Sequence, residues 1–145
     1  AASAQGQLER ALADVERVLK LNPNDAYAWE TAHVVHLRRN ALEPAEQCLR
    51  RVLELNPTCD SYVRLGRLLQ QRGAFDELES VLAAAAQLEA LNGEVMLLRG
   101  DLYVHQNRLD LAREQYERAR EVDPVRASAG AKIGLDYLAA QPAAK

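Results

Sequence analysis

The chain has 145 residues, of which 48% are apolar and 27% charged, a balance typical of one folded domain rather than of a disordered segment. Its formal net charge of −3 lacks the basic excess that nucleic-acid binding requires. No run of about 18 apolar residues is present, so we expect no insertion into a membrane.

The distribution of apolar residues predicts eight helices and no strand. In the first helix Leu8, Leu12, Val15 and Leu19 recur at the spacing of one helix face. In chain order, the predicted helices are Gln7–Leu21, Ala26–Arg39, Glu43–Leu55, Ser61–Gln71, Phe75–Ala90, Glu94–Gln106, Leu109–Glu121 and Arg126–Ala140.

Proline, asparagine and glycine mark the ends of these helices. Proline disfavours a helical residue before it, so helices are expected to stop at Pro23, Pro57 and Pro124. At 92–93 an Asn-Gly pair is expected to end a helix through a left-handed cap. A positive φ is expected in the tight turns between paired helices, at Asn40, Gly73 and Asn107.

A 34-residue period runs through the chain. Pro23 and Pro57 are 34 residues apart and both close the triplet Leu-Asn-Pro. The same step separates Gly66, Gly100 and Gly134. A helical hairpin of this length cannot bury its apolar face alone, so copies must stack on one another.

The repeated residues resemble the tetratricopeptide repeat, whose slots hold Trp, Leu, Gly, Tyr, Ala, Phe and Pro. The third copy fills them with Met96, Arg99, Gly100, Tyr103, Ala112, Tyr116 and Pro124. The first copy departs from the pattern, since His33 occupies the glycine slot and His36 the tyrosine slot, and looser or locally altered packing is expected there. Ala90 replaces a closing proline, and one residue is missing from the turn near Cys59.

This resemblance implies an all-α fold, a right-handed α-solenoid of stacked antiparallel helix hairpins. Half copies at both ends predict a segment of a longer protein with an exposed apolar stripe at each end, formed by Leu8, Leu12, Val15 and Leu19 and by Ile133, Tyr137 and Leu138. Weak self-association through these ends is expected. The chain is expected to divide into a disordered or cloning-derived leader (1–6), a solenoid (7–140) and a tail (141–145). Within the solenoid, a half repeat (7–25) is followed by three full repeats (26–59, 60–92 and 93–126) and a second half repeat (127–140).

Motifs for chemistry are absent from the sequence. It contains no nucleophile elbow, Walker loop, zinc-peptidase motif or dinucleotide fingerprint, so we expect neither an enzyme nor a cofactor. His33 and His36 could reach one metal ion, but no further ligand is obviously placed, and packing is preferred. Cys48, on a helix face, and Cys59, in a turn, are expected to be free thiols. A cytoplasmic location is favoured, with the periplasm open if a signal lies outside these residues.

The resemblance also implies a concave groove lined by the first helix of each repeat. Its residues mix apolar groups with charges of both signs, which suits an extended peptide or a partner helix. For each residue, packing between helices is the alternative. The candidate contacts are Tyr27, Glu30, Val34, Arg38, Val63, Arg67, Gln71, Leu97, Asp101 and His105.

One known use of this fold is disfavoured by the residues themselves. Tetratricopeptide co-chaperones grip the terminal carboxylate of Hsp70 or Hsp90 with Lys, Asn and Arg side chains. The corresponding positions here include Glu30 and Glu94, which would repel a carboxylate; the others are Val34, Arg64 and Leu98. We therefore predict a non-catalytic scaffold that binds another protein by a different contact. The alternative is a structural spacer or self-assembly segment of a larger complex.

Overall fold

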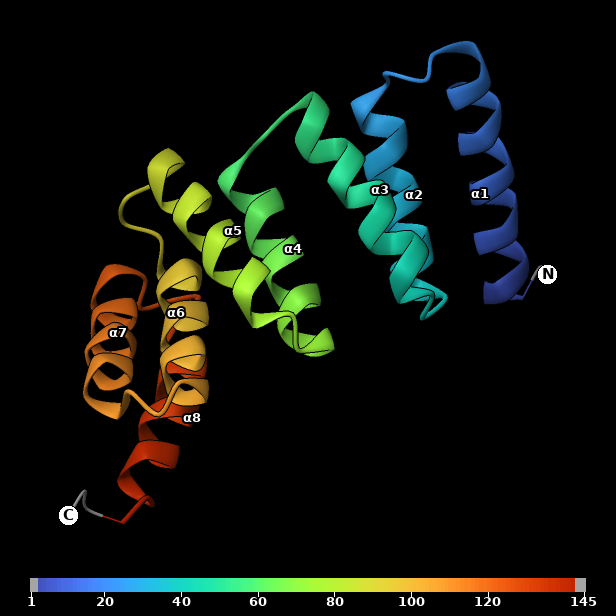
Figure 1. Cartoon of the computed structure of the whole chain (residues 1–145). Coiled ribbons are helices and arrows are strands. Elements are labelled where there is room, and N and C mark those ends of the chain that lie inside the picture. Colours follow the sequence, from blue (N-terminus) through green and yellow to red (C-terminus); the bar gives the residue numbers. More distant parts are fainter. Residues whose placement is uncertain (1–2, 143–145) are drawn as a thin grey trace. The chain divides into compact units, whose positions relative to one another are not determined.

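The computed structural model describes residues 3–142 and folds them into eight α-helices, with no strand among these residues (Figure 1). The predicted all-α fold is confirmed, and each helix lies close to its predicted bounds. None of the described helices is long and apolar enough to cross a membrane. The helices are α1 (Ala4–Leu21), α2 (Ala26–Arg38), α3 (Leu42–Leu55), α4 (Cys59–Arg72), α5 (Phe75–Leu88), α6 (Gly93–His105), α7 (Leu109–Val122) and α8 (Ser128–Ala139).

The helices belong to two compact units, and the boundary between the units falls inside α4. Unit 1 ends at Leu68 and contains α1, α2, α3 and the start of α4. Unit 2 begins at Leu69 and contains the end of α4 and helices α5 to α8.

In unit 1 the core is formed where α1 and α3 pack against α2. Val15 of α1 contacts a cluster that includes Ala32 of α2 and Cys48 of α3, and Leu19 packs at its edge. Trp29 also packs there, and its indole N–H donates to the carbonyl of Pro23 at 2.8 Å, which ties the α1–α2 loop to α2. The prediction of an exposed stripe on α1 is wrong, because α2 covers this face: Val15 is only 7% exposed, and Leu8, Leu12 and Leu19 are half-buried.

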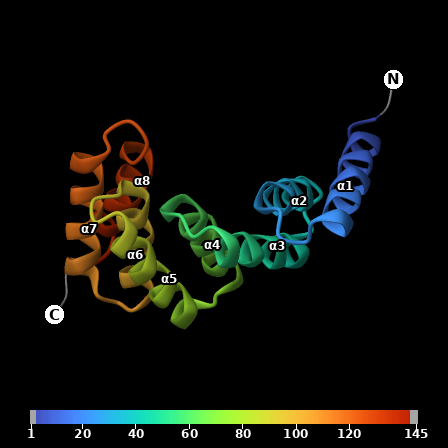
Figure 2. The same cartoon turned by 90° about the horizontal axis from the view of Figure 1, so that it is seen from above.

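In unit 2, α6, α7 and α8 pack side by side (Figures 1 and 2). Small residues allow this close approach, since Ala112 of α7 and Ala131 of α8 are completely buried. Leu138 is buried in the same cluster, so the prediction that it belongs to an exposed stripe is wrong. Ile133 and Tyr137 on the same helix are exposed, as predicted.

The ring of Tyr116 fills the space between two glycines that lie 34 residues apart. A Cβ atom added to Gly100 of α6 would lie 2.5 Å from Cε1 of Tyr116, and one added to Gly134 of α8 would lie 2.5 Å from Cζ. No real Cβ contact is that short, so both positions require the absence of a side chain. The step from Gly100 to Gly134 therefore reflects one aromatic ring packed between α6 and α8.

The three turns predicted to need a positive φ have one. The φ angles are 57° at Asn40, 77° at Gly73 and 58° at Asn107. After each of these residues the next amide reaches back to a helix carbonyl, as Arg108 does to Tyr103 at 2.8 Å. This geometry ends the first helix of each pair and returns the chain for the second.

Several local predictions need correction. Asn92 does not form a left-handed cap; it has φ −122° and caps the start of α6 by accepting from the Val95 amide at 3.1 Å. Cys59 lies in the first turn of α4 and is buried, although a turn was predicted. The missing residue is nevertheless confirmed, because the α3–α4 loop (56–58) is one residue shorter than the α1–α2 loop (22–25).

The start of the chain also differs from the predicted leader. Residues 4–6 are helical, and the Ser3 side chain caps α1 by accepting from the Gly6 amide at 3.2 Å. The predicted leader is therefore wrong for this part, and its residues 1–2 lie outside the described residues. Of the predicted tail, Gln141 and Pro142 are described and residues 143–145 lie outside that part of the chain.

Substitution of Gly100 tests its close contact with the Tyr116 ring directly. We expect Gly100→Ala to lower the free energy of unfolding by about 1–3 kcal/mol, because the new methyl group overlaps the Tyr116 ring. In a Tyr116→Leu background the same substitution should be less destabilising, since the ring is gone. Denaturant unfolding of the four proteins measures this coupling. Equal effects of Gly100→Ala in both backgrounds would contradict the contact.

Candidate binding surface

A cavity of about 380 Å3 lies in unit 2 where α6, α7 and α8 meet. Gly130 and Gly134 line the cavity on the α8 side, where the Leu97 side chain lies close to Gly130 and the Tyr116 ring lies close to Gly134. The cavity is open to solvent on one side. Its lining residues are Asp101 and Val104 of α6, Tyr116 of α7, and Gly130, Ile133, Gly134 and Tyr137 of α8.

Asp101 is the one charged residue in this lining, and neutral groups hold its carboxylate in place. The Tyr116 hydroxyl donates to Oδ1 at 2.5 Å, and the Gln70 amide donates to Oδ2 at 2.7 Å. Burial raises the pKa of Tyr116, and the bond to Asp101 raises it further, so the phenol stays protonated. None of the ion pairs within residues 3–142 involves Asp101.

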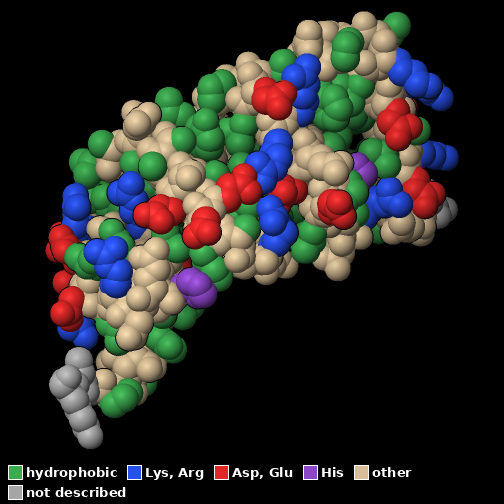
Figure 3. Space-filling view, viewed as in Figure 1, with side chains coloured by type: hydrophobic (Ala, Val, Ile, Leu, Met, Phe, Trp, Pro, Cys, Tyr) green, Lys and Arg blue, Asp and Glu red, His purple; other side chains and the backbone are tan. Residues whose placement is uncertain are grey.

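The rim of the cavity is apolar. Ile133 is 73% exposed and Tyr137 is 50% exposed, so both offer apolar area beside the cavity. On the face seen in Figure 3, acidic and basic side chains are interspersed and no single-sign patch forms.

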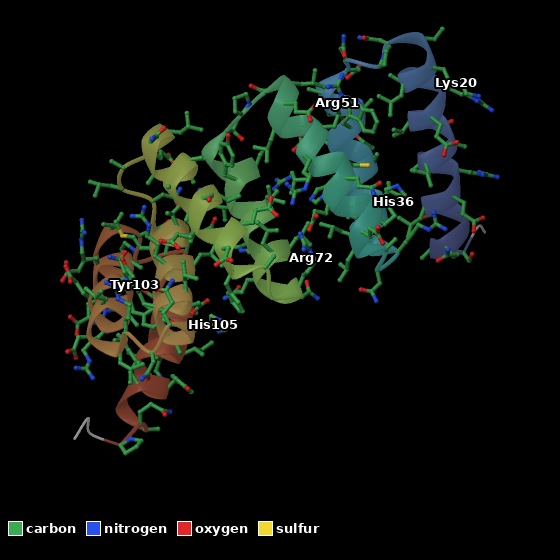
Figure 4. All side chains as sticks on the ribbon, viewed as in Figure 1. Lys20, His36, Arg51, Arg72, Tyr103 and His105 are labelled. Carbon is green, nitrogen blue, oxygen red and sulfur yellow. The ribbon has the colours of Figure 1, made fainter. Side chains whose placement is uncertain are left out.

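The predicted groove residues of unit 2 occupy three different environments. Asp101 lines the cavity, whereas Leu97 is half-buried beneath α8, close to the backbone at Gly130. His105 is exposed at the end of α6, away from α7 (Figure 4), and stacks on the Phe75 ring with centroids 3.6 Å apart. Gln71 is exposed near the end of α4.

The predicted residues of unit 1 do not share one environment either. Tyr27 is 79% exposed near the start of α2, and Arg38 is exposed at its end. Glu30 is already paired with Arg64, at 3.2 Å. Val63 is only 1% exposed and lies in the interior, so its side chain offers no surface. Val34 is half-buried and Arg67 is exposed.

Of the residues that line the cavity, sequence reasoning assigned Asp101 to the binding groove but did not assign Tyr116, Ile133 or Tyr137 to it. Tyr116 was assigned to a packing slot, and Ile133 and Tyr137 to an exposed stripe. The available signal was the step from Gly100 to Gly134, which shows that α8 approaches the same tyrosine as α6.

Comparison with known proteins identifies the family. Residues 1–140 match the family described as Tetratricopeptide repeat-like domain. The chain belongs to this family. No curated protein sequence is significantly similar to it.

Solved structures of tetratricopeptide repeat proteins share the fold. The crystal structure of MamA has a TM-score of 0.75 and 19% identity, covering 92% of this chain and 80% of that chain. YrrB, a TPR protein with an unusual peptide-binding site, has a TM-score of 0.72 and 25% identity, covering 90% and 69%. The Arabidopsis OM64 TPR domain has a TM-score of 0.68 and 16% identity, covering 78% and 93%.

One slot of this tetratricopeptide repeat protein is unusual. His33 stands where the pattern has glycine, and it is only 1% exposed. Its Nδ1 lies 2.8 Å from the carbonyl of Ala45, so Nδ1 carries the proton and donates across the α2–α3 pair. The altered packing that was expected at His33 therefore takes the form of a buried hydrogen bond between α2 and α3.

Two other histidine nitrogens of α2 are buried without a hydrogen-bond partner within residues 3–142. Neither Nε2 of His33 nor Nδ1 of His36, which is labelled in Figure 4, has a hydrogen-bond partner among the described residues. In residues 3–142 no three His, Cys, Asp or Glu side chains gather as a metal site would require. Burial lowers the pKa of both histidines, so both are held neutral.

Acid should therefore destabilise the chain through these histidines. Because their pKa values are lowered from 6.5 in the folded state, the unfolded chain binds more protons once the pH falls to about that value. The free energy of unfolding should then fall as the pH drops from 6.5 towards the lowered pKa values. Urea unfolding between about pH 7.5 and pH 5 measures this loss.

His33→Asn provides the control, since its side-chain amide can still donate to Ala45 and does not titrate. We expect a weaker pH dependence in this variant, with the remainder due to His36. An unchanged dependence would show that His33 is not responsible.

Proposed function

We propose that this chain is a non-catalytic protein-interaction scaffold, which binds an extended peptide or a helix of another protein. The surface proposed is the α6–α8 face of unit 2, formed by Asp101, Val104, Ile133 and Tyr137. The observation that carries the proposal is the cavity between these helices, with its exposed apolar rim.

The physical chemistry of this surface favours protein binding. Exposed apolar and aromatic side chains beside a cavity are typical of the anchor points of protein interfaces. Ile133 and Tyr137 supply apolar area, while Asp101 supplies one fixed polar contact that can orient the partner. A small number of polar groups in an apolar setting is the usual composition of a binding site.

The family supports the same function. Repeat folds of stacked helices expose long surfaces that bind other proteins. YrrB, which shares the fold, is described as having a peptide-binding site. By contrast, the described residues of the cavity lining offer one carboxylate and two phenols, and no nucleophile lies beside a base among them.

Selection of peptides from a displayed random library against the whole chain tests this function. We expect selected peptides to bind with dissociation constants of roughly 1–100 μM, measured by calorimetry. Ile133→Ser should weaken that binding by about tenfold, because it removes an exposed apolar contact at the rim.

Leu91→Ser is the matched control, since Leu91 is 64% exposed in the same unit and does not line the cavity. It should leave peptide binding unchanged. The proposal is wrong if no peptide is selected, or if Leu91→Ser weakens binding while Ile133→Ser does not.

The exposure of Ile133 and Tyr137 also favours a second function, self-assembly of the chain through α8. In that case sedimentation would show association that rises with concentration and is lost in Ile133→Ser. A monomer that binds selected peptides would instead favour the scaffold.

A further inference from the structure

We propose that the cavity beside Asp101 takes the basic side chain of a lysine or arginine from a partner protein. This inference rests on the proposed scaffold function and names the chemistry of the partner. It follows from the carboxylate in the lining of the cavity, the apolar residues beside it, and the comparison of α8 with its equivalent helix α6.

The charge of Asp101 is oriented but not neutralised. Its two oxygens accept from the hydroxyl of Tyr116 and the amide of Gln70, and both of these donors are uncharged. A carboxylate oxygen can accept more than one hydrogen bond, so acceptor capacity remains for a ligand. A cation would complement the carboxylate, whereas a second acidic group would be repelled.

Among residues 3–142, basic groups do not occupy that position. Lys132, the lysine of α8, pairs with Asp136 at 3.2 Å. Within the described part of the chain, Asp101 has hydrogen bonds but no ion pair. A cation from outside the chain would therefore make the first ion pair to this carboxylate.

The walls of the cavity suit the aliphatic part of a basic side chain. Val104 and Ile133 are apolar, and the half-exposed ring of Tyr137 offers an aromatic face. Lysine and arginine bury their methylene groups against such surfaces while the charged end reaches a polar partner. A volume of about 380 Å3 lies near the lower end of the range for ligand sites (about 300–1,000 Å3), which suits one side chain rather than a whole peptide.

The repeat itself provides an internal comparison. Tyr103 of α6, labelled in Figure 4, has the guanidinium of Arg108 over its ring at 5.1 Å. Tyr137 of α8 is 34 residues after Tyr103, in the same slot, but the residue 34 positions after Arg108 is Pro142. The chain thus supplies a cation, Arg108, to the ring of Tyr103, whereas the position equivalent to Arg108 in the next repeat is a proline. A basic side chain from a partner would restore the missing cation–π contact at Tyr137.

A small probe can test the cavity without any selected peptide. We would titrate N-acetyl-arginine amide into the 15N-labelled chain and follow the backbone amides by NMR. We expect saturable shifts centred on Val104, Gly130 and Gly134, with a dissociation constant in the range of roughly 1–20 mM. The neutral isostere N-acetyl-citrulline amide should bind at least about fivefold more weakly, because it lacks the charge.

Two variants and one control locate the effect. Asp101→Asn should abolish the preference for arginine over citrulline, and Tyr137→Ser should weaken arginine binding about threefold or more. Glu117→Gln removes an equal charge from an exposed position of α7 and should change nothing. The NMR spectra also show whether each variant is folded, and Tyr137 lies on the rim, so this variant tests the cavity even if Asp101→Asn does not fold.

The outcomes separate this inference from the proposed function. Equal binding of arginine and citrulline, or an arginine preference unchanged in Asp101→Asn, would overturn the inference. If selected peptides then still depended on Ile133, the scaffold function would stand without it. Conversely, arginine-specific shifts at the cavity would support the inference even if no peptide were selected and the proposed function failed.

Discussion

The insertion of Tyr116 between Gly100 and Gly134 is the contact on which the architecture of unit 2 depends. The ring replaces two missing side chains and lets α6 and α8 approach the same helix from either side. Close packing of this kind tolerates little change in volume, which explains why both neighbours are glycine. The step from Gly100 to Gly134 is thus a requirement of packing as well as a mark of repetition.

The same tyrosine links the fold to the proposed site. Its ring belongs to the core, while its hydroxyl reaches Asp101 in the lining of the cavity, and Gln70 of α4 fixes the other carboxylate oxygen. Because the ring is fixed in the core, its hydroxyl holds the Asp101 carboxylate in one position before a partner binds. Less conformational entropy is then lost on binding. The core and the candidate site are therefore stabilised by one side chain.

Most of the fold could be predicted from the sequence, because helix ends and turns depend on local residues. Asn40, Gly73 and Asn107 have the positive φ that their turns require. The error at Asn92 arose because an Asn before Gly can either end one helix or cap the start of the next. Which of the two occurs depends on the length of the loop, and here Asn92 lies at the end of the α5–α6 loop, directly before α6. The candidate site was harder to predict, since the contact from Gln70 to Asp101 joins residues 31 positions apart through side-chain rotamers that no periodic pattern specifies. The sequence analysis also predicted an exposed face on α1. It did not take into account that a half repeat can pack on the next helix in the chain, which here is α2.

Native-state hydrogen exchange in variants of Tyr116 tests most directly whether this ring holds α6 and α8 together. Tyr116→Phe keeps the ring and removes only the hydroxyl, whereas Tyr116→Leu removes the ring. We predict that Tyr116→Leu lowers the protection of the α8 amides together with that of the buried α6 amides, and that Tyr116→Phe leaves most of this protection in place. Protection of α8 that is unchanged in Tyr116→Leu, or reduced equally by both substitutions, would contradict the account.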